Sequence, residues 1–228
     1  MRRLTKLTPA EKKLGWFYWA FQLVLLPVIL VLLNDHFGSP MTETEMNLLF
    51  FVLNFVLLLF IFHKFIFHSC KTGILRPFRT LRWAFFGFGL YWLCSLAVGW
   101  LILDLNPDFV NVNDQSIFLM LEENYSLTVL GTVLLAPVAE ELLYRGLIFG
   151  TLYERSKLLA YILSTLLFAA VHVVGYVTVY DFPTLMLCLL QYLPAGLCLG
   201  FAYARTGSIL TPILAHIAVN QIAISSAR

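Results

Sequence analysis

The sequence predicts an all-α protein, a polytopic transmembrane helix bundle of about seven helices. Of its 228 residues, 60% are hydrophobic and only 12% are charged, whereas soluble domains carry roughly 25% charged residues. Apolar runs long enough to cross roughly 30 Å of hydrocarbon recur along the chain. A barrel strand would alternate over about ten residues, so helices are the spanning structure that fits. The net charge of +2 is too small to indicate a nucleic-acid partner.

The chain divides into apolar segments with no polar stretch long enough for a separate soluble domain. The first run follows a basic start and ends at Asn34-Asp35 without a small-residue cleavage pattern. A signal peptide has an apolar core of only about 7–15 residues, so we expect a retained anchor. The predicted helices cover about 14–33, 46–67, 83–103, 127–152, 158–177, 182–204 and 208–224.

The charges of the connecting segments predict the orientation. The first and third connections carry acids without Lys or Arg. Because Lys and Arg prefer the cytoplasmic side, we expect a multi-pass protein of the cell membrane with a cytoplasmic N-terminus. An odd number of helices then places the C-terminus outside. The basic residues on which this orientation depends lie before the first helix and in the second connection: Arg2, Arg3, Lys6, Lys12, Lys13, Lys64, Lys71, Arg76, Arg79 and Arg82.

Two connecting stretches allow further expectations. Residues 74–82 mix apolar and basic side chains, which suits either the headgroup layer over anionic lipid or an ordinary positive-inside loop. Residues 116–123 are expected to form a short interfacial helix. The four cysteines have no metal-type spacing, and we expect no disulfide framework. They are Cys70, Cys94, Cys188 and Cys198.

The fourth segment carries three ionisable residues within an apolar run, Glu140, Glu141 and Arg145. Such groups at membrane depth usually line a cavity and indicate a functional site. Consecutive residues of a helix point about 100° apart, so the two carboxyls have different surroundings. Arg145 lies four residues after Glu141, on the same face, and can keep that carboxyl ionised. Glu140 is the less compensated carboxyl, which suits a general base.

An acid–base cluster at a helix end is the alternative for these three residues, but the apolar run continues past Arg145. The fifth segment adds His172, with Phe168 on the same face, and the seventh adds His216 and Asn220, again four apart. Alone, each histidine also fits a core residue or a contact between helices. Pro137 and Pro212 precede these polar groups and can bend their helices.

The depth of each polar residue in the membrane indicates whether the polar groups of the three helices can meet. Measured along a helix from the nearest predicted inner turn, Glu140, His172 and His216 lie roughly 21, 27 and 16 Å into the membrane. Helix tilts of about 20° absorb much of this spread. We therefore expect the three helices to converge on one water-accessible cavity.

The ordered set of motifs resembles the CAAX protease and bacteriocin-processing (Abi) family, which includes the type II CAAX prenyl endopeptidases. The motifs are Glu-Glu-x-x-x-Arg, Phe-x-x-x-His and His-x-x-x-Asn, and the resemblance covers about residues 127–224. It divides the chain into N-terminal transmembrane helices over 1–125 and a CAAX protease-like catalytic helix bundle over 126–228.

The resemblance implies an intramembrane endopeptidase that acts on membrane-associated peptides or proteins. Glu140 would activate a water, aided by His172, while His216 and Asn220 would stabilise the oxyanion. Glu141, Arg145 and Phe168 would support the site. We expect no cofactor, because His-Glu-x-x-His spacing is missing, but zinc held by Glu140, His172 and His216 is the alternative.

Two other classes of function are alternatives to the peptidase, a non-enzymatic protein and a transporter. A non-enzymatic bacteriocin self-immunity or scaffold protein on the same fold would be favoured by loss of Glu140 or of a histidine, and the full set is present. A transporter with a proton relay would be expected to show similar halves with broken helices. The halves of this chain do not resemble each other, and the sequence does not indicate the substrate.

Overall fold

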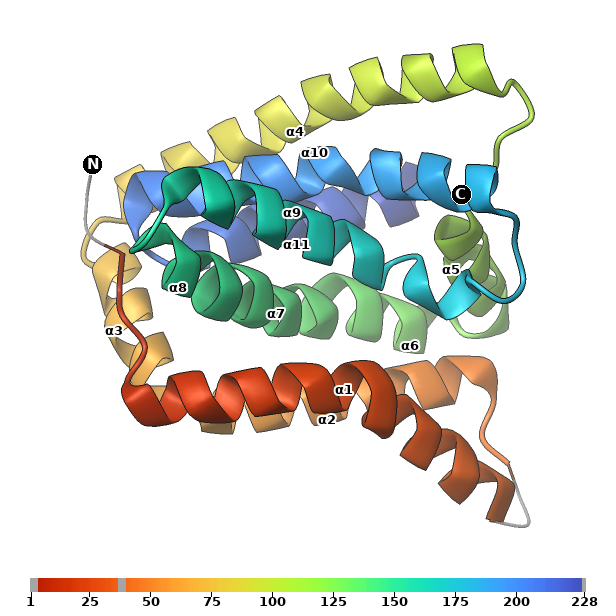
Figure 1. The fold of residues 1–228 in the computed structure, drawn as a ribbon, viewed down its shortest axis with the longest axis horizontal. Helices are drawn as coiled ribbons and strands as arrows, with labels where there is room; N and C mark the ends of the chain where they lie inside the picture. Colours follow the sequence, from red (N-terminus) through yellow and green to blue (C-terminus); the bar gives the residue numbers. More distant parts are fainter. Residues whose placement is uncertain (1–3, 37–39, 227–228) are drawn as a thin grey trace.

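The computed structural model describes residues 4–36 and 40–226 and confirms the all-α membrane bundle (Figure 1). Arg2 and Arg3, which entered the orientation argument, lie outside the described residues. Within the described part, five helices are long and apolar enough to cross a membrane. They are Pro9–His36, Glu43–Ile61, Pro77–Leu105, Tyr125–Tyr153 and Phe182–Thr206, and two shorter apolar helices, Lys157–Val171 and Leu210–Ser226, complete the seven predicted segments.

Helices α1 (Pro9–His36) and α2 (Glu43–Ile61) lie side by side along one face of the bundle (Figure 1). Each begins with reciprocal side-chain caps. Thr8 and Glu11 bond each other's backbone N–H ahead of α1, and Thr42 and Glu45 do the same for α2. Such caps satisfy the first N–H groups, which have no partner within the helix.

The second predicted helix was wrong in its last part, because the chain breaks at Phe62 and starts α3 (His63–Ile74). The cause lies far away in the sequence. The buried carboxylate of Glu11 accepts a hydrogen bond from the Phe65 N–H at 2.8 Å, so it caps the first turn of α3. Figure 1 shows α3 crossing one end of the bundle instead of following the long helices.

The chain then runs along α4 (Pro77–Leu105) to α5 (Val112–Glu123) at the opposite end of the bundle (Figure 1). The predicted short helix over 116–123 is present, but it begins earlier. Asn111 causes this start, because its side-chain oxygen accepts the backbone N–H groups of Asn113 and Asp114. The basic stretch 74–82 is mostly helical, since α3 ends and α4 begins within it.

The next helix is continuous from Tyr125 to Tyr153 but contains two π-helical stretches between α-helical ones. It comprises α6 (Tyr125–Val129), η1 (Leu130–Leu135), α7 (Ala136–Glu141), η2 (Leu142–Phe149) and α8 (Gly150–Tyr153). Both η1 and η2 are π-helical. π-Helical turns occur frequently at functional sites, and here they flank the two glutamates.

The fifth predicted segment, 158–177, was too long. Helix α9 (Lys157–Val171) stops at Val171, and the 3₁₀ turn η3 (Val174–Tyr176) follows. The run after His172 consists largely of Val, Gly and Thr, which are poor helix formers. His172 therefore caps the C-terminal end of α9 instead of lying inside a helix.

Helix α10 (Phe182–Thr206) packs against α4, α9 and α11 (Leu210–Ser226). The Asp181 side chain caps its start, and Gly207 ends it with a φ of 71°. Pro212 was expected to kink the last helix. It lies in the first turn of α11, where a backbone N–H has no partner within the helix, so it fits without a kink.

Candidate active site

One cavity of about 520 Å³ brings the predicted polar residues together. Glu140, Phe168, His172, His216 and Asn220 all line it, although they come from α7, α9, the end of α9 and α11. Residues of α2, α4, α5, η1, η3 and α10 supply the remaining walls. Glu141 and Arg145 do not line the cavity and lie behind it, fully buried.

The buried pair behind the cavity matches the predicted spacing. Arg145 Nη1 lies 2.9 Å from Glu141 Oε1, with both side chains completely covered. Arg145 Nη2 donates to two carbonyls of α10, those of Ala195 at 3.1 Å and Gly196 at 3.2 Å. Burial of a charge is stable only when it is paired and hydrogen-bonded in this way. Arg145 thus fixes Glu141 and ties α10 to the fourth segment.

Beside these carbonyls, Gly196 allows α10 to pack closely against α9. A Cβ added there would lie 2.6 Å from Thr165 Cγ2 of α9, well inside normal contact distance. Phe168 packs against the Arg145 guanidinium, with its ring centroid 4.4 Å from the guanidinium carbon. A guanidinium over an aromatic face is attracted by the ring quadrupole. Phe168 therefore separates the buried charge from the cavity that it lines.

His216 lies between the two glutamates, a contact that the spacing of the sequence did not reveal. Its Nδ1 is 2.8 Å from Glu141 Oε1, and its Nε2 is 3.8 Å from Glu140 Oε2. A carboxylate only accepts hydrogen bonds, so the shorter contact requires the hydrogen on Nδ1. Nε2 can then donate only if the ring is doubly protonated, and otherwise it accepts.

The two adjacent carboxyls differ in exposure as the helical geometry predicted. The Glu140 side chain is 22% exposed, whereas that of Glu141 is fully buried. The Glu140 carboxylate approaches His216 Nε2 only to 3.8 Å, beyond hydrogen-bond distance. Its carboxylate thus faces the cavity and is available to a bound molecule.

His172 is held by its backbone neighbour and by an aromatic ring. Its Nδ1 is 2.8 Å from the Phe168 carbonyl oxygen, so Nδ1 carries the hydrogen and donates. The imidazole stacks on the Tyr192 ring at a centroid distance of 4.2 Å and an angle of 21°. In the neutral ring Nε2 is therefore a free acceptor, which is the form that can bind a water proton.

One of the two amide hydrogens of Asn220 is already hydrogen-bonded within the protein. Its Nδ2 donates to the Thr132 carbonyl of η1 at 2.9 Å. The sequence predicted that His216 and Asn220 both donate to one point. Instead, His216 Nδ1 and one Asn220 hydrogen are engaged elsewhere, which leaves the second amide hydrogen of Asn220 for a ligand.

Sequence reasoning missed the polar network that joins α5 to α10 at this cavity. The Tyr192 hydroxyl donates to Asp114 Oδ1 at 3.1 Å, and Gln191 Nε2 donates to Asp114 Oδ2 at 3.3 Å. Burial raises the pKa of Asp114, while the hydrogen bond from Tyr192 opposes this shift. The adjacent polar residues Gln191 and Tyr192 inside an apolar segment were the available signal.

The zinc alternative was tested on the placement of the side chains. Across residues 4–36 and 40–226, no group of three or more His, Cys, Asp or Glu side chains is arranged to hold a metal ion. Glu141 already binds Nδ1 of His216, and Glu140 lies 3.8 Å from its Nε2. The set Glu140, His172 and His216 does not fit a zinc site as these side chains are placed, so no step is derived through a metal.

The C-terminal part of the chain matches known proteins. Residues 122–222 match the family described as type II CAAX prenyl endopeptidase Rce1-like. The protein described as "Putative membrane peptidase YdiL" of Bacillus subtilis (strain 168) is 32% identical over 99 residues, which are 43% of this chain and 36% of that protein. The chain thus spans about a third of the length of this relative. No solved structure matches the chain.

Proposed function

We propose that the chain is an intramembrane endopeptidase, because its residues 122–222 match the family described as type II CAAX prenyl endopeptidase Rce1-like. It would hydrolyse peptide bonds of membrane-associated peptides or proteins with a water activated by Glu140. The observation that carries this proposal is the cavity, in which a partly exposed carboxylate, two imidazoles and an amide face one space.

The attack on the peptide bond uses Glu140 and His172. A water in the cavity donates one hydrogen bond to the Glu140 carboxylate and the other to Nε2 of His172. As the water oxygen attacks the peptide carbonyl carbon, Glu140 takes its proton, and a tetrahedral oxyanion forms. Glu140 then passes this proton to the leaving nitrogen while the C–N bond breaks. The products are a carboxylic acid and an amine, so atoms and charge balance.

The oxyanion is stabilised by His216 and Asn220. His216 donates from Nε2 to the oxyanion and from Nδ1 to Glu141, so this role requires the doubly protonated ring. Asn220 donates the amide hydrogen that Thr132 does not use. Glu141 and Arg145 act as positioning residues, because they fix the His216 ring through the 2.8 Å contact to Nδ1. Preorganised donors of this kind are a large part of catalysis in hydrolases.

The proposal extends to the organisation of the chain in the membrane. Residues 126–228 form the catalytic bundle, and residues 1–125 supply the transmembrane helices that cover it. The N-terminus is cytoplasmic. The cavity then opens toward the outer side, because α5 forms part of its wall and lies at the end away from α3 (Figure 1). Membrane-impermeant thiol labelling tests this, with Arg82→Cys and Gln115→Cys in a background without the native cysteines. Gln115→Cys labelled only from the cytoplasmic side would reverse the orientation.

A peptidase assay tests the activity itself. Purified protein is incubated in lipid vesicles with a library of membrane-peptide substrates, beside Glu140→Gln. We expect cleavage by the wild type and turnover at background level for Glu140→Gln, with unchanged thermal unfolding, since only the base is removed. Activity that survives a strong chelator is also expected. Full activity of Glu140→Gln would refute the glutamate mechanism, and activity lost on chelation but restored by zinc would favour the zinc alternative.

A further inference from the structure

We propose that the corner where α3 meets α4, together with the end of α10, binds an anionic phospholipid, with Arg82 and Arg205 holding its phosphate beside Trp83. This site lies at the end of the bundle away from α5 and shares no residue with the proposed active site (Figure 1). It does not depend on the peptidase activity. Of the two expectations for residues 74–82, it corresponds to the headgroup layer over anionic lipid.

Helix α3 is a fixed part of the bundle and not a loose connection. Its buried face carries Phe65, Ser69 and Gly73. Ser69 Oγ accepts the backbone N–H of Ile209 at 2.8 Å, and the Ser69 carbonyl oxygen accepts the Ser208 hydroxyl at 2.9 Å. A Cβ added at Gly73 would overlap Ser208 Oγ, so the two segments are in close contact. The opposite face of α3 is therefore held in one orientation, away from the other helices.

This outward face and the corner after it combine large apolar side chains with cations. Phe67, Leu75 and Phe78 are 65%, 69% and 88% exposed. Exposed cations are interspersed with them, namely Lys64, Lys71, Arg76 and Arg82. Such a mixture is typical of a helix that lies in the headgroup layer, because the apolar groups enter the acyl chains while the cations stay at the phosphates.

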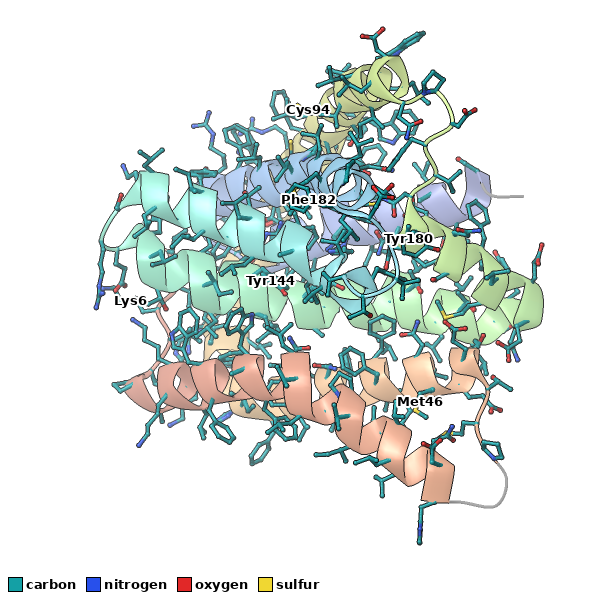
Figure 2. The ribbon with its side chains drawn as sticks, turned by 45° about the vertical axis from the view of Figure 1, so that its right-hand side comes forward. Lys6, Met46, Cys94, Tyr144, Tyr180 and Phe182 are labelled. Carbon is teal, nitrogen blue, oxygen red and sulfur yellow. The ribbon has the colours of Figure 1, made fainter. Side chains whose placement is uncertain are left out.

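The position of α3 in the bundle agrees with this layer. Helices α1 and α4 begin, and α2 and α10 end, at the end of the bundle that α3 crosses (Figure 1). Figure 2 shows Lys6 and Tyr180 toward opposite ends of the bundle, and Lys6 belongs to the α3 end. A spanning helix reaches the headgroups where its apolar stretch begins or ends. On the proposed orientation this is the cytoplasmic leaflet, whose anionic lipids give it a negative surface potential.

The cations of the corner lack carboxylates of their own. Residues 46–103 contain no Asp or Glu. Glu11 is buried and caps α3, and Glu154 is paired with two lysines near the start of the chain. No carboxylate of the described residues forms an ion pair with Arg82 or Arg205. A lipid phosphate would supply this anion, and a guanidinium matches its geometry through paired hydrogen bonds.

The indole of Trp83 lies where two of these cations meet. The guanidinium carbon of Arg205 is 4.7 Å from the ring centroid, and that of Arg82 is 5.9 Å from it. Arg205 also lies 4.9 Å from the Phe201 ring, and its carbonyl oxygen accepts a hydrogen bond from Arg79 of α4. Aromatic rings attract and orient cations, and tryptophan prefers the headgroup level of a membrane. Two exposed guanidinium groups are thus held near one ring at the level of the phosphates.

Lipid binding to the purified protein tests the site. Protein in detergent micelles is titrated with dioleoyl phosphatidylglycerol or dioleoyl phosphatidylcholine, and bound lipids are counted by native mass spectrometry. Both lipids have the same acyl chains and a phosphate, but only phosphatidylglycerol has a net negative charge. We expect the first phosphatidylglycerol to bind at least about tenfold more tightly, because each basic residue near an anionic lipid surface contributes about fivefold in affinity.

Single substitutions assign the preference to its residues. Arg82→Gln and Arg205→Gln should each weaken phosphatidylglycerol binding about fivefold and leave phosphatidylcholine binding nearly unchanged. Lys13→Gln is the matched control, since it removes an exposed cation of α1 from the same end of the bundle, and it should change either affinity by less than about twofold. Phe78→Ala should weaken both lipids alike, because an apolar contact does not distinguish headgroups. Thermal unfolding verifies that each variant is folded.

Four results would overturn the proposal. The wild type could bind both lipids equally, or its preference for phosphatidylglycerol could persist in Arg82→Gln and Arg205→Gln. Lys13→Gln could weaken that preference as much as Arg82→Gln does, which would indicate a general attraction between charges without a defined site. Glycerol phosphate could displace phosphatidylglycerol at equal concentration, which would mean that the site recognises a free anion. None of these measurements involves peptide cleavage, so the peptidase proposal is decided separately by its own assay.

Discussion

The helices that carry the site differ from those that face the lipid. In α1, α2 and α4, only 22%, 17% and 11% of the most apolar 18-residue window is buried within the protein, whereas half of that window is buried in 125–153 and 182–206. The two covered helices hold Glu140, Glu141, Arg145, Gln191 and Tyr192. The central parts of the three lipid-facing helices hold no Asp, Glu, Lys or Arg.

This difference shows where a membrane protein can keep charge. A lipid-facing carboxylate has no water and no partner, whereas a helix packed within the bundle can supply both. Arg145 is fully buried, yet it has Glu141, two carbonyl oxygens and an aromatic face. The lipid-facing helices thus mainly cover the bundle, although α2 and α4 also line part of the cavity, and the side chains proposed as catalytic lie on the other helices.

The largest effect on stability is expected for Glu141→Gln. The substitution leaves the Arg145 guanidinium buried without its carboxylate, and removing one partner of a buried pair costs roughly 3–5 kcal/mol. It also replaces the charged acceptor of His216 Nδ1 by a neutral amide oxygen. We expect a marked fall in thermal stability in detergent micelles and in the amount of folded protein.

Glu140→Gln is the matched control, since it changes the adjacent residue in the same way but at a partly exposed side chain. Its unfolding should resemble that of the wild type. Equal stability of the two variants would contradict the separate roles of the adjacent carboxyls.

A smaller but clear effect is expected at the proposed oxyanion donors, His216 and Asn220. His216→Leu or Asn220→Asp removes a donor, and the loss of one such donor typically lowers turnover by about 10²–10³. The rate constant kcat should fall more than KM rises, because the oxyanion exists only after the attack.

The contact of Asn220 with Thr132 allows a test of whether Asn220 only stabilises the fold or also donates to the oxyanion. Its carbonyl accepts from Asn220 Nδ2 at 2.9 Å. Asn220→Ala loses this contact and the donor together, whereas Asn220→Gln retains an amide. Partial rescue of kcat by Gln relative to Ala, with equal thermal stability, is expected for a donor to the oxyanion. A change in stability alone would assign Asn220 to packing.

The sequence was sufficient for features that depend on local spacing. The apolar runs predicted the seven hydrophobic segments, and the four-residue interval predicted the Glu141–Arg145 pair that the structure contains. The different exposure of Glu140 and Glu141 also followed from the 100° step of a helix. Such features need only the chain within one helix.

Features that depend on distant parts of the chain were not predictable in this way. The break at Phe62 depends on Glu11, which accepts the Phe65 N–H from 54 residues away. The contact of His216 with Glu141 spans 75 residues. The wall that Asp114 and Tyr192 form spans 78 residues. Periodicity identifies a polar face but not its partner, so the orienting contacts of the histidines became visible only in three dimensions.

The smallest effect is expected at the lipid-facing surface, and two phenylalanines provide a matched test. Phe149 of η2 is fully buried against Tyr153, Tyr161 and Tyr203, whereas Phe85 of α4 is 78% exposed. Phe149→Ala leaves a cavity among packed rings and should cost about 3–5 kcal/mol. Phe85→Ala removes contacts mainly with lipid, which the unfolded chain in the membrane also makes, so a change within about 0.5 kcal/mol is expected. Thermal unfolding of both variants in the same lipid vesicles measures this difference. A comparable loss for Phe85→Ala would mean that α4 is covered by another protein surface in the membrane, and the division between covering and covered helices would then have to be redrawn.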